Sequence, residues 1–188
     1  SDKPWMEERK EKDIQQSPVA IYEVHLGSWR RKGSHGEEYL SYKELAYQLT
    51  DYVLRMGYTH VELLGIIEHL KEESMGHEIF GFYAPTSRFG TANSLKFLIN
   101  YLHQNGIGVI LDWTPVAMTK DGAGISEFDG TALFETTDQK KTSLLKWDTV
   151  PFDYSKNQVK NYMFANARFW MDEFHIDGFR IAALDSLL

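Results

Sequence analysis

The chain has 188 residues, enough to bury one hydrophobic core but short of the roughly 250 residues typical of a complete eight-stranded β/α barrel. Its net charge of −7 argues against a nucleic-acid partner, because phosphate-backbone binding relies on clustered lysine and arginine. The absence of cysteine excludes disulfides, a thiol nucleophile and a cysteine-based metal site. No apolar run approaches the roughly 18 residues of a membrane span, and no secretory signal is visible. We therefore expect a cytoplasmic protein without a membrane partner.

The start of the chain differs in composition from the rest. Residues 1–17 are mostly charged and polar, which is typical of a linker or of the tail of a preceding domain, with a short helix over 7–12. Residues 18–188 form the predicted domain. Its first strand is predicted at Val19–Leu26, a β-rich run between a proline and a glycine.

Helices and strands alternate through the remainder of the domain. Apolar residues recur at helical spacing in three segments, and each segment precedes a short apolar run typical of a buried strand. In chain order the pattern predicts a helix over 41–57, a strand over 60–67, a helix over 91–104, a strand over 108–113, a helix over 157–174 and a strand over 175–184. Ser41 and Glu44 are spaced to form a capping box at the start of the first helix. Long connections with little regular pattern, 68–90 and 116–153, follow the second and third strands, and connections of this length are often functional.

This alternation predicts right-handed crossovers and a parallel sheet, so the fold class is α/β, built from parallel β/α units. Ligands bind such sheets at the carboxyl ends of the strands. The first strand is not followed by the glycine pattern of a dinucleotide site, and no phosphate-binding loop occurs in the sequence. We therefore expect no cofactor.

Five segments carry distinctive motifs. They are Ser17–Arg31 (SPVAIYEVHLGSWRR), Leu40–Leu64, Gly81–Thr91 (GFYAPTSRFGT), Gly108–Trp113 (GVILDW) and Glu127–Leu133 (EFDGTAL). Together they resemble the opening of the catalytic barrel of bacterial 1,4-α-glucan (glycogen) branching enzymes, in the α-amylase superfamily. The resemblance implies a (β/α)8 TIM barrel of which this chain holds the first half, strands one to four. It also implies a parent transferase that converts α-1,4 to α-1,6 glucan linkages.

The resemblance breaks at the positions that carry the chemistry. The family's fourth strand reads Gly-x-Arg-x-Asp-Ala with the Asp as nucleophile, whereas here Arg180 is kept and Ala182 holds the nucleophile position. After the third strand Asp112 and Trp113 are kept, but Ala117 replaces a sugar-contacting histidine. The family's general acid follows the fifth strand, beyond residue 188. Because retaining glycoside chemistry needs two carboxyl groups about 5 Å apart, we expect no intact catalytic set and no activity.

The loop after the second strand departs from the family as well. Gly65 and Leu70 stand where the family has prolines. Met75, His77 and Glu78 replace a tryptophan, the sugar-stacking tyrosine and a glutamine of the family. Any α-glucan binding that the resemblance still implies is therefore weak.

Other polar and aromatic residues have both a functional and a structural interpretation. The positions that the resemblance assigns to weak substrate binding are His77, Tyr83, Asp112, Trp113 and Arg180. Trp29, Trp113 and Trp147 can stack on glucose, but core packing is the better explanation of each. The histidines show no metal spacing, and no metal site is expected; His25 is interpreted as a hydrogen-bonding core residue.

Two further expectations concern the carboxylates near the fourth strand. We expect Arg180 to pair with a nearby carboxylate such as Asp112. Asp185 cannot replace the missing nucleophile, since side chains alternate along a strand and Asp185 faces away from Arg180 and Ala182.

Three interpretations of function follow. The chain is an inactive relative or fragment of a branching enzyme, an engineered half-barrel scaffold that self-associates, or a non-catalytic α-glucan-binding module. A half-barrel leaves its inward face and two strand edges without partners, so we expect a homodimer that closes the barrel, with a monomeric open sheet as the alternative. The candidates for apolar surface at that opening are Val24, Leu64, Ile66, Leu111 and Ile181.

Overall fold

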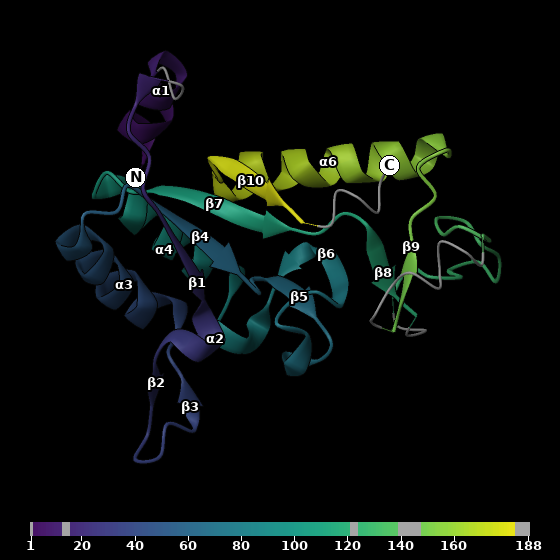
Figure 1. Cartoon of the computed structure of the whole chain (residues 1–188), viewed down its shortest axis with the longest axis horizontal. Helices are drawn as coiled ribbons and strands as arrows, with labels where there is room; N and C mark the ends of the chain where they lie inside the picture. Colours follow the sequence, from purple (N-terminus) through teal and green to yellow (C-terminus); the bar gives the residue numbers. More distant parts are fainter. Residues whose placement is uncertain (1, 13–15, 121–123, 139–147, 183–188) are drawn as a thin grey trace.

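The structure is a computed structural model that describes residues 2–12, 16–120, 124–138 and 148–182 (Figure 1). Its centre is a parallel sheet of four strands in the order β1-β4-β7-β10. These strands are β1 (Ile21–His25), β4 (His60–Leu64), β7 (Gly108–Trp113) and β10 (Gly178–Ile181). The predicted fold class, parallel β/α units that form half of a barrel, is confirmed.

Three helices connect these strands, namely α3 (Tyr42–Met56), α4 (Ala92–Gln104) and α6 (Asn157–Phe174). Their apolar stripes meet the strands in one core, which holds Leu49 of α3, Leu98 of α4 and Trp170 of α6. The capping box predicted at the start of the first of them is present, because the Glu44 backbone N–H donates to the Ser41 hydroxyl and the Glu44 carboxylate accepts from the Ser41 backbone. The stripes and the cap are local signals, and both predicted these helices correctly.

Alternation along the strands decides which side chains meet the helices. Val24 and Leu111, with exposed fractions of 3% and 0%, lie in the helix-covered core, and Ile66 is also buried there. The expectation that these three residues line the open face is therefore wrong. The strand positions of Val24 and Leu111 place them on the helix side, and Ile66, between β4 and β5, is buried in the same core. Leu64 is half-buried, and Ile181 is exposed at the edge strand β10.

The connections contain more regular structure than the sequence indicates. The connection after β1 contains α2 (Leu26–Trp29) and the strand pair β2 (Arg31–Lys32) and β3 (Glu38–Tyr39). The connection after β4 contains β5 (Ile67–His69), η2 (Glu72–Ser74), β6 (Ile79–Pro85) and η3 (Ser87–Phe89). The connection after β7 contains β8 (Ala117–Thr119) and β9 (Thr149–Pro151). Each of the last two connections holds an antiparallel strand pair. The expectation of irregular loops is wrong here, because the strands are only three to seven residues long and their partners are distant in sequence.

The first residues form helix α1 (Lys3–Glu11), longer than the short helix expected over 7–12. Trp5 and Arg9 of this helix both donate hydrogen bonds to Asp177, just before β10. The segment is thus attached to the amino ends of the strands by specific polar contacts. No helix among the described residues is long and apolar enough to cross a membrane.

Candidate functional site

Asp112 and Arg180, the two polar residues that this chain shares with the family motifs, lie near the carboxyl ends of two neighbouring strands. Asp112 of β7 and Arg180 of β10 are partners in the sheet register, and their side chains point to the same face. The Arg180 Nη1 donates to Asp112 Oδ1 over 3.0 Å, which confirms the expected pairing. The Asp112 side chain is 6% exposed and that of Arg180 is 53% exposed, so the guanidinium covers the carboxylate from the solvent side.

Ala182 lies directly after β10, two residues beyond Arg180. Its backbone N–H donates to the Trp113 carbonyl over 3.2 Å, which keeps the residue in register at the end of the sheet. Its side chain is a methyl group, so the position that the resemblance assigns to the nucleophile offers no oxygen. Asp185, excluded as a replacement on the sequence alone, lies outside the described residues.

Two of the candidate substrate-binding aromatics are engaged in packing. Trp113 is 9% exposed, and its Nε1 donates to Asn166 Oδ1 over 2.9 Å. Tyr83 packs against Tyr162 and donates its hydroxyl to the Tyr162 carbonyl over 2.7 Å. Burial raises the pKa of Tyr83. Trp113 therefore belongs to the core, and Tyr83 holds β6 against α6.

The other candidate positions lie apart from the Asp112–Arg180 pair. His77 is half-buried in the turn before β6, where its backbone N–H donates to the Ser74 carbonyl. Ala117, at the family's histidine position, is 7% exposed and pairs with Pro151 across β8 and β9. Trp29 stays partly buried against the core and beneath the Arg30 guanidinium, while Trp147 lies outside the described residues.

The structure adds two acidic residues to this face that the sequence did not single out. Glu62 of β4 is 8% exposed and lies beside Glu23 of β1 in the sheet register. Burial raises the pKa of Glu62, and the charges of Glu23 and Asp112 raise it further, while Arg180 opposes them. The only signal in the sequence was the position of both glutamates in otherwise apolar strands.

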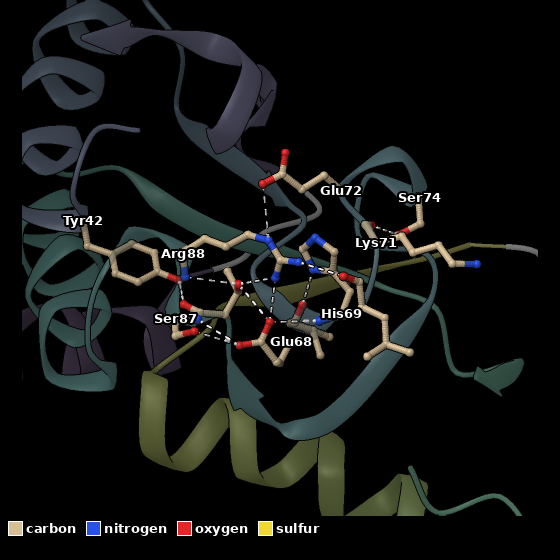
Figure 2. Close-up of polar contacts among 11 residues, drawn as sticks. Tyr42, Glu68, His69, Lys71, Glu72, Ser74, Ser87 and Arg88 are labelled. Atoms are coloured by element: carbon tan, nitrogen blue, oxygen red, sulfur yellow. Dashed lines mark hydrogen bonds and ion pairs between the residues drawn. The ribbon is translucent and has the colours of Figure 1, made fainter. Parts of the chain in front are cut away.

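A second polar cluster fixes the loop after β4 (Figure 2). The Arg88 Nη1 donates to Glu68 Oε1 over 2.7 Å, and its Nη2 donates to the Leu70 carbonyl over 3.1 Å. Glu68 also accepts from the Ser87 backbone N–H over 3.0 Å, and Tyr42 donates to the Thr86 carbonyl over 2.9 Å. These bonds anchor both ends of the loop in which the resemblance places sugar contacts.

The glycine that replaces a family proline changes this loop. Gly65 has φ +68°, which proline cannot adopt. A Cβ at Gly65 would lie 2.7 Å from His25 Nε2, and one at Gly76 would lie 2.5 Å from the Gly65 Cα. The turn around Met75 therefore sits directly on the Gly65 backbone, in an arrangement that only small residues permit.

Beside this turn lies a cavity of about 220 Å³. Its walls include His25, His69 and Arg31. Burial lowers the pKa of His25 and of His69, so both imidazoles are favoured in the neutral form. His25 contacts the Ser28 hydroxyl through Nδ1 over 3.2 Å. No group of three or more potential ligands among the described residues could hold a metal ion.

No protein-family model matches the chain. The 1,4-α-glucan branching enzyme of Cellvibrio japonicus is 50% identical over 187 residues, an alignment that covers 100% of this chain and 25% of that protein. The corresponding enzyme of Hydrogenovibrio crunogenus is 48% identical and is covered to 26%. The chain thus spans about a quarter of the length of the curated relatives that it matches.

Solved structures with a similar fold are α-amylases. The α-amylase of Geobacillus thermoleovorans in complex with acarbose has a TM-score of 0.71 at 24% identity, covering 87% of this chain and 40% of that chain. The maltogenic α-amylase AmyB of Thermotoga neapolitana has a TM-score of 0.68 at 23% identity, covering 89% of this chain and 41% of that chain. The resemblance read from the motifs is confirmed: the chain is homologous over its whole length with about one quarter of 1,4-α-glucan branching enzymes, and it folds as part of an α-amylase-type barrel.

Proposed function

We propose that the chain is part of a branching-enzyme-type barrel that has lost glucan transfer. The observation that carries this proposal is the methyl group of Ala182 beside an intact Asp112–Arg180 pair. The arginine remains in place, but the carboxylate that the resemblance places next to it is missing. Without that oxygen no covalent glycosyl intermediate forms at this position, because the retaining mechanism begins with attack by a carboxylate.

The carboxylates nearby do not substitute for the missing one. Asp112 is bound by Arg180, which orients it as a structural ion pair. Glu62 lies on β4, two strands away from β10 in the sheet order, and burial raises its pKa. A nucleophile needs a charged oxygen aimed at the sugar, so neither residue fits that role.

We also propose that binding to α-glucan is weak. Aromatic faces provide much of the contact with sugars, and here Trp113 is in the core while Tyr83 packs against Tyr162. The positions that the resemblance assigns to a sugar-stacking tyrosine and a sugar-contacting histidine hold His77 and Ala117. A separate function as a glucan-binding module has no supporting observation in these contacts.

Two assays test the proposal. The chain itself, incubated with amylose, should produce no α-1,6 branches above a control without protein. In the second assay the chain replaces the aligned quarter of the Cellvibrio japonicus enzyme, with the native enzyme as control. We expect the chimera to be inactive and to gain activity only when Ala182→Asp is combined with Ala117→His. Branching by the unmodified chain or chimera would overturn the proposal.

A further inference from the structure

His103 lies in the last turn of α4, and its side chain has no exposed surface. Its Nδ1 lies 3.0 Å from Asp2 Oδ2, and its Nε2 lies 2.9 Å from Asp177 Oδ2. A carboxylate oxygen only accepts hydrogen bonds, so each contact requires a proton on the ring nitrogen. A neutral imidazole carries one such proton, whereas the imidazolium carries two. The geometry is therefore that of a charged His103 held between two carboxylates.

Both carboxyl groups beside His103 are ionised near neutral pH. Burial by itself raises the pKa of Asp2, but hydrogen bonds from His175 and His103 lower it below its usual value. Burial likewise opposes ionisation of Asp177, but its hydrogen bonds and the charge of His103 lower its pKa to about 2. Neither group keeps a proton that it could donate to the ring. Asp2 also begins α1 without capping it, because its side chain contacts the two histidines instead of the helix N–H groups.

Two further features favour a positive charge on His103. The Trp5 ring stacks on the imidazole, with centroids 4.9 Å apart and planes 10° apart, and a cation over the face of a tryptophan is attracted to it. The position near the carboxyl end of α4 also favours a cation through the helix dipole. Burial opposes a charge on the ring, but it also strengthens both ion pairs because water is excluded from them. Asp2 and Trp5 supply these contacts only while α1 is in place.

The other charged or titratable groups around His103 come from α1, from β4 and from the segment before β10; they are Glu8, Arg9, Lys12, His60 and His175.

Each of these groups has a definite place. Arg9 donates to Asp177 Oδ1, the oxygen that does not face the ring. Glu8 lines a hollow of about 320 Å³ together with His103, where its charge favours a cation. Burial lowers the pKa of His60, which favours its neutral form. His175 contacts the same oxygen of Asp2 as His103 does, so a test must separate the two histidines.

We propose that residues 2–11 form a pH-sensitive latch, which closes on the amino ends of the strands only while His103 is an imidazolium. When the pH rises and His103 loses a proton, one ring nitrogen presents a lone pair to a carboxylate. A buried carboxylate that loses its donor is costly, so the contact opens. Asp177 keeps the Val109 backbone N–H as a donor, whereas Asp2 returns to solvent together with α1. The protonation of one side chain thus decides whether the segment before β1 is bound to the segment before β10.

Nitrogen NMR of the histidine rings tests the proposal together with fluorine NMR of the chain labelled with fluorotryptophan, in which Trp5→Phe assigns the Trp5 signal. Near neutral pH we expect protons on both ring nitrogens of His103 and on only one of His60. As the pH rises, proton loss from His103 and the change of Trp5 to a solvated signal should share one midpoint, while the buried Trp170 keeps its signal. A singly protonated His103 under a docked helix, different midpoints, or a change of Trp170 together with Trp5 would overturn the proposal.

Three variants separate the latch from a merely structural contact. His103→Gln keeps an amide donor but no charge, so Trp5 should be solvated at every pH. His175→Gln is the matched control, since it removes the other histidine that contacts Asp2, and the transition should persist. Asp2→Asn removes one of the two negative charges at the ring without touching the core, and should move the transition to lower pH by about one unit. A docked helix in His103→Gln, a transition lost in His175→Gln, or an unshifted midpoint in Asp2→Asn would refute the latch.

Discussion

Asp177 contacts both the first helix and the sheet, and the removal of its carboxylate has a calculable cost. Asp177 accepts hydrogen bonds from Trp5 Nε1 at 2.8 Å, Arg9 Nη1 at 2.9 Å, His103 Nε2 at 2.9 Å and the Val109 backbone N–H at 2.8 Å. Burial by itself raises the pKa of Asp177, but the hydrogen bond and charge of His103, with the Trp5 and Val109 donors, lower it to about 2.

The difference from the ordinary value of 3.8 corresponds to about 2.5 kcal/mol of native-state stabilisation. Because the folded-state pKa is lowered, this stabilisation is complete above the unfolded value and is lost as the pH falls toward about 2. Asp177→Asn should therefore lower the free energy of unfolding by about 2.5 kcal/mol near neutral pH, and the difference from the unmodified chain should shrink on acidification.

Urea unfolding followed by circular dichroism, at several pH values from neutral to acidic, measures this difference directly. Asp172→Asn is a suitable control, since Asp172 forms an exposed pair with Arg168 whose neutralisation should change little. A cost below about 1 kcal/mol near neutral pH, or a cost independent of pH, would refute the assignment of this stabilisation to the Asp177 carboxylate.

Further predictions concern the loop after β4, the binding of α-glucan and the oligomeric state of the chain. Gly65→Pro, which restores the family residue, should lower the thermal midpoint, because φ is +68° and the added atoms meet His25; an unchanged midpoint would contradict the geometry. Tyr42→Phe should cost about 1–3 kcal/mol in urea unfolding, because the Thr86 carbonyl loses its buried donor; no loss would mean that this bond is not formed. Maltoheptaose should cause no saturable chemical-shift change at micromolar concentration, and saturation there would show a functional glucan site. Light scattering should give the mass of a homodimer, as the open edges lead us to expect, and a monomer mass that persists at high protein concentration would rule the dimer out.

The sequence by itself determined the elements whose signals are local. Helical spacing of apolar residues and the Ser41 and Glu44 capping box located α3, and comparable periodicity located α4 and α6. The motifs also predicted the family, and the assignment of the nucleophile position to Ala182 is what that resemblance implies. Such signals lie within a few residues of one another, so they can be read without knowing which segments meet.

Tertiary structure decided which face each strand presents and which distant groups become partners. A period of two shows that Glu62 and Leu63 point to opposite sides, but only the packing of helices on one face shows that Leu63 enters the core. His103 meets Asp2 and Asp177, separated from it by 101 and 74 residues, through contacts that no local pattern encodes. The burial of Glu62 and its closeness to Glu23 and Asp112 arise only when the chain has folded. The raised pKa of Glu62 could therefore not be predicted from the sequence.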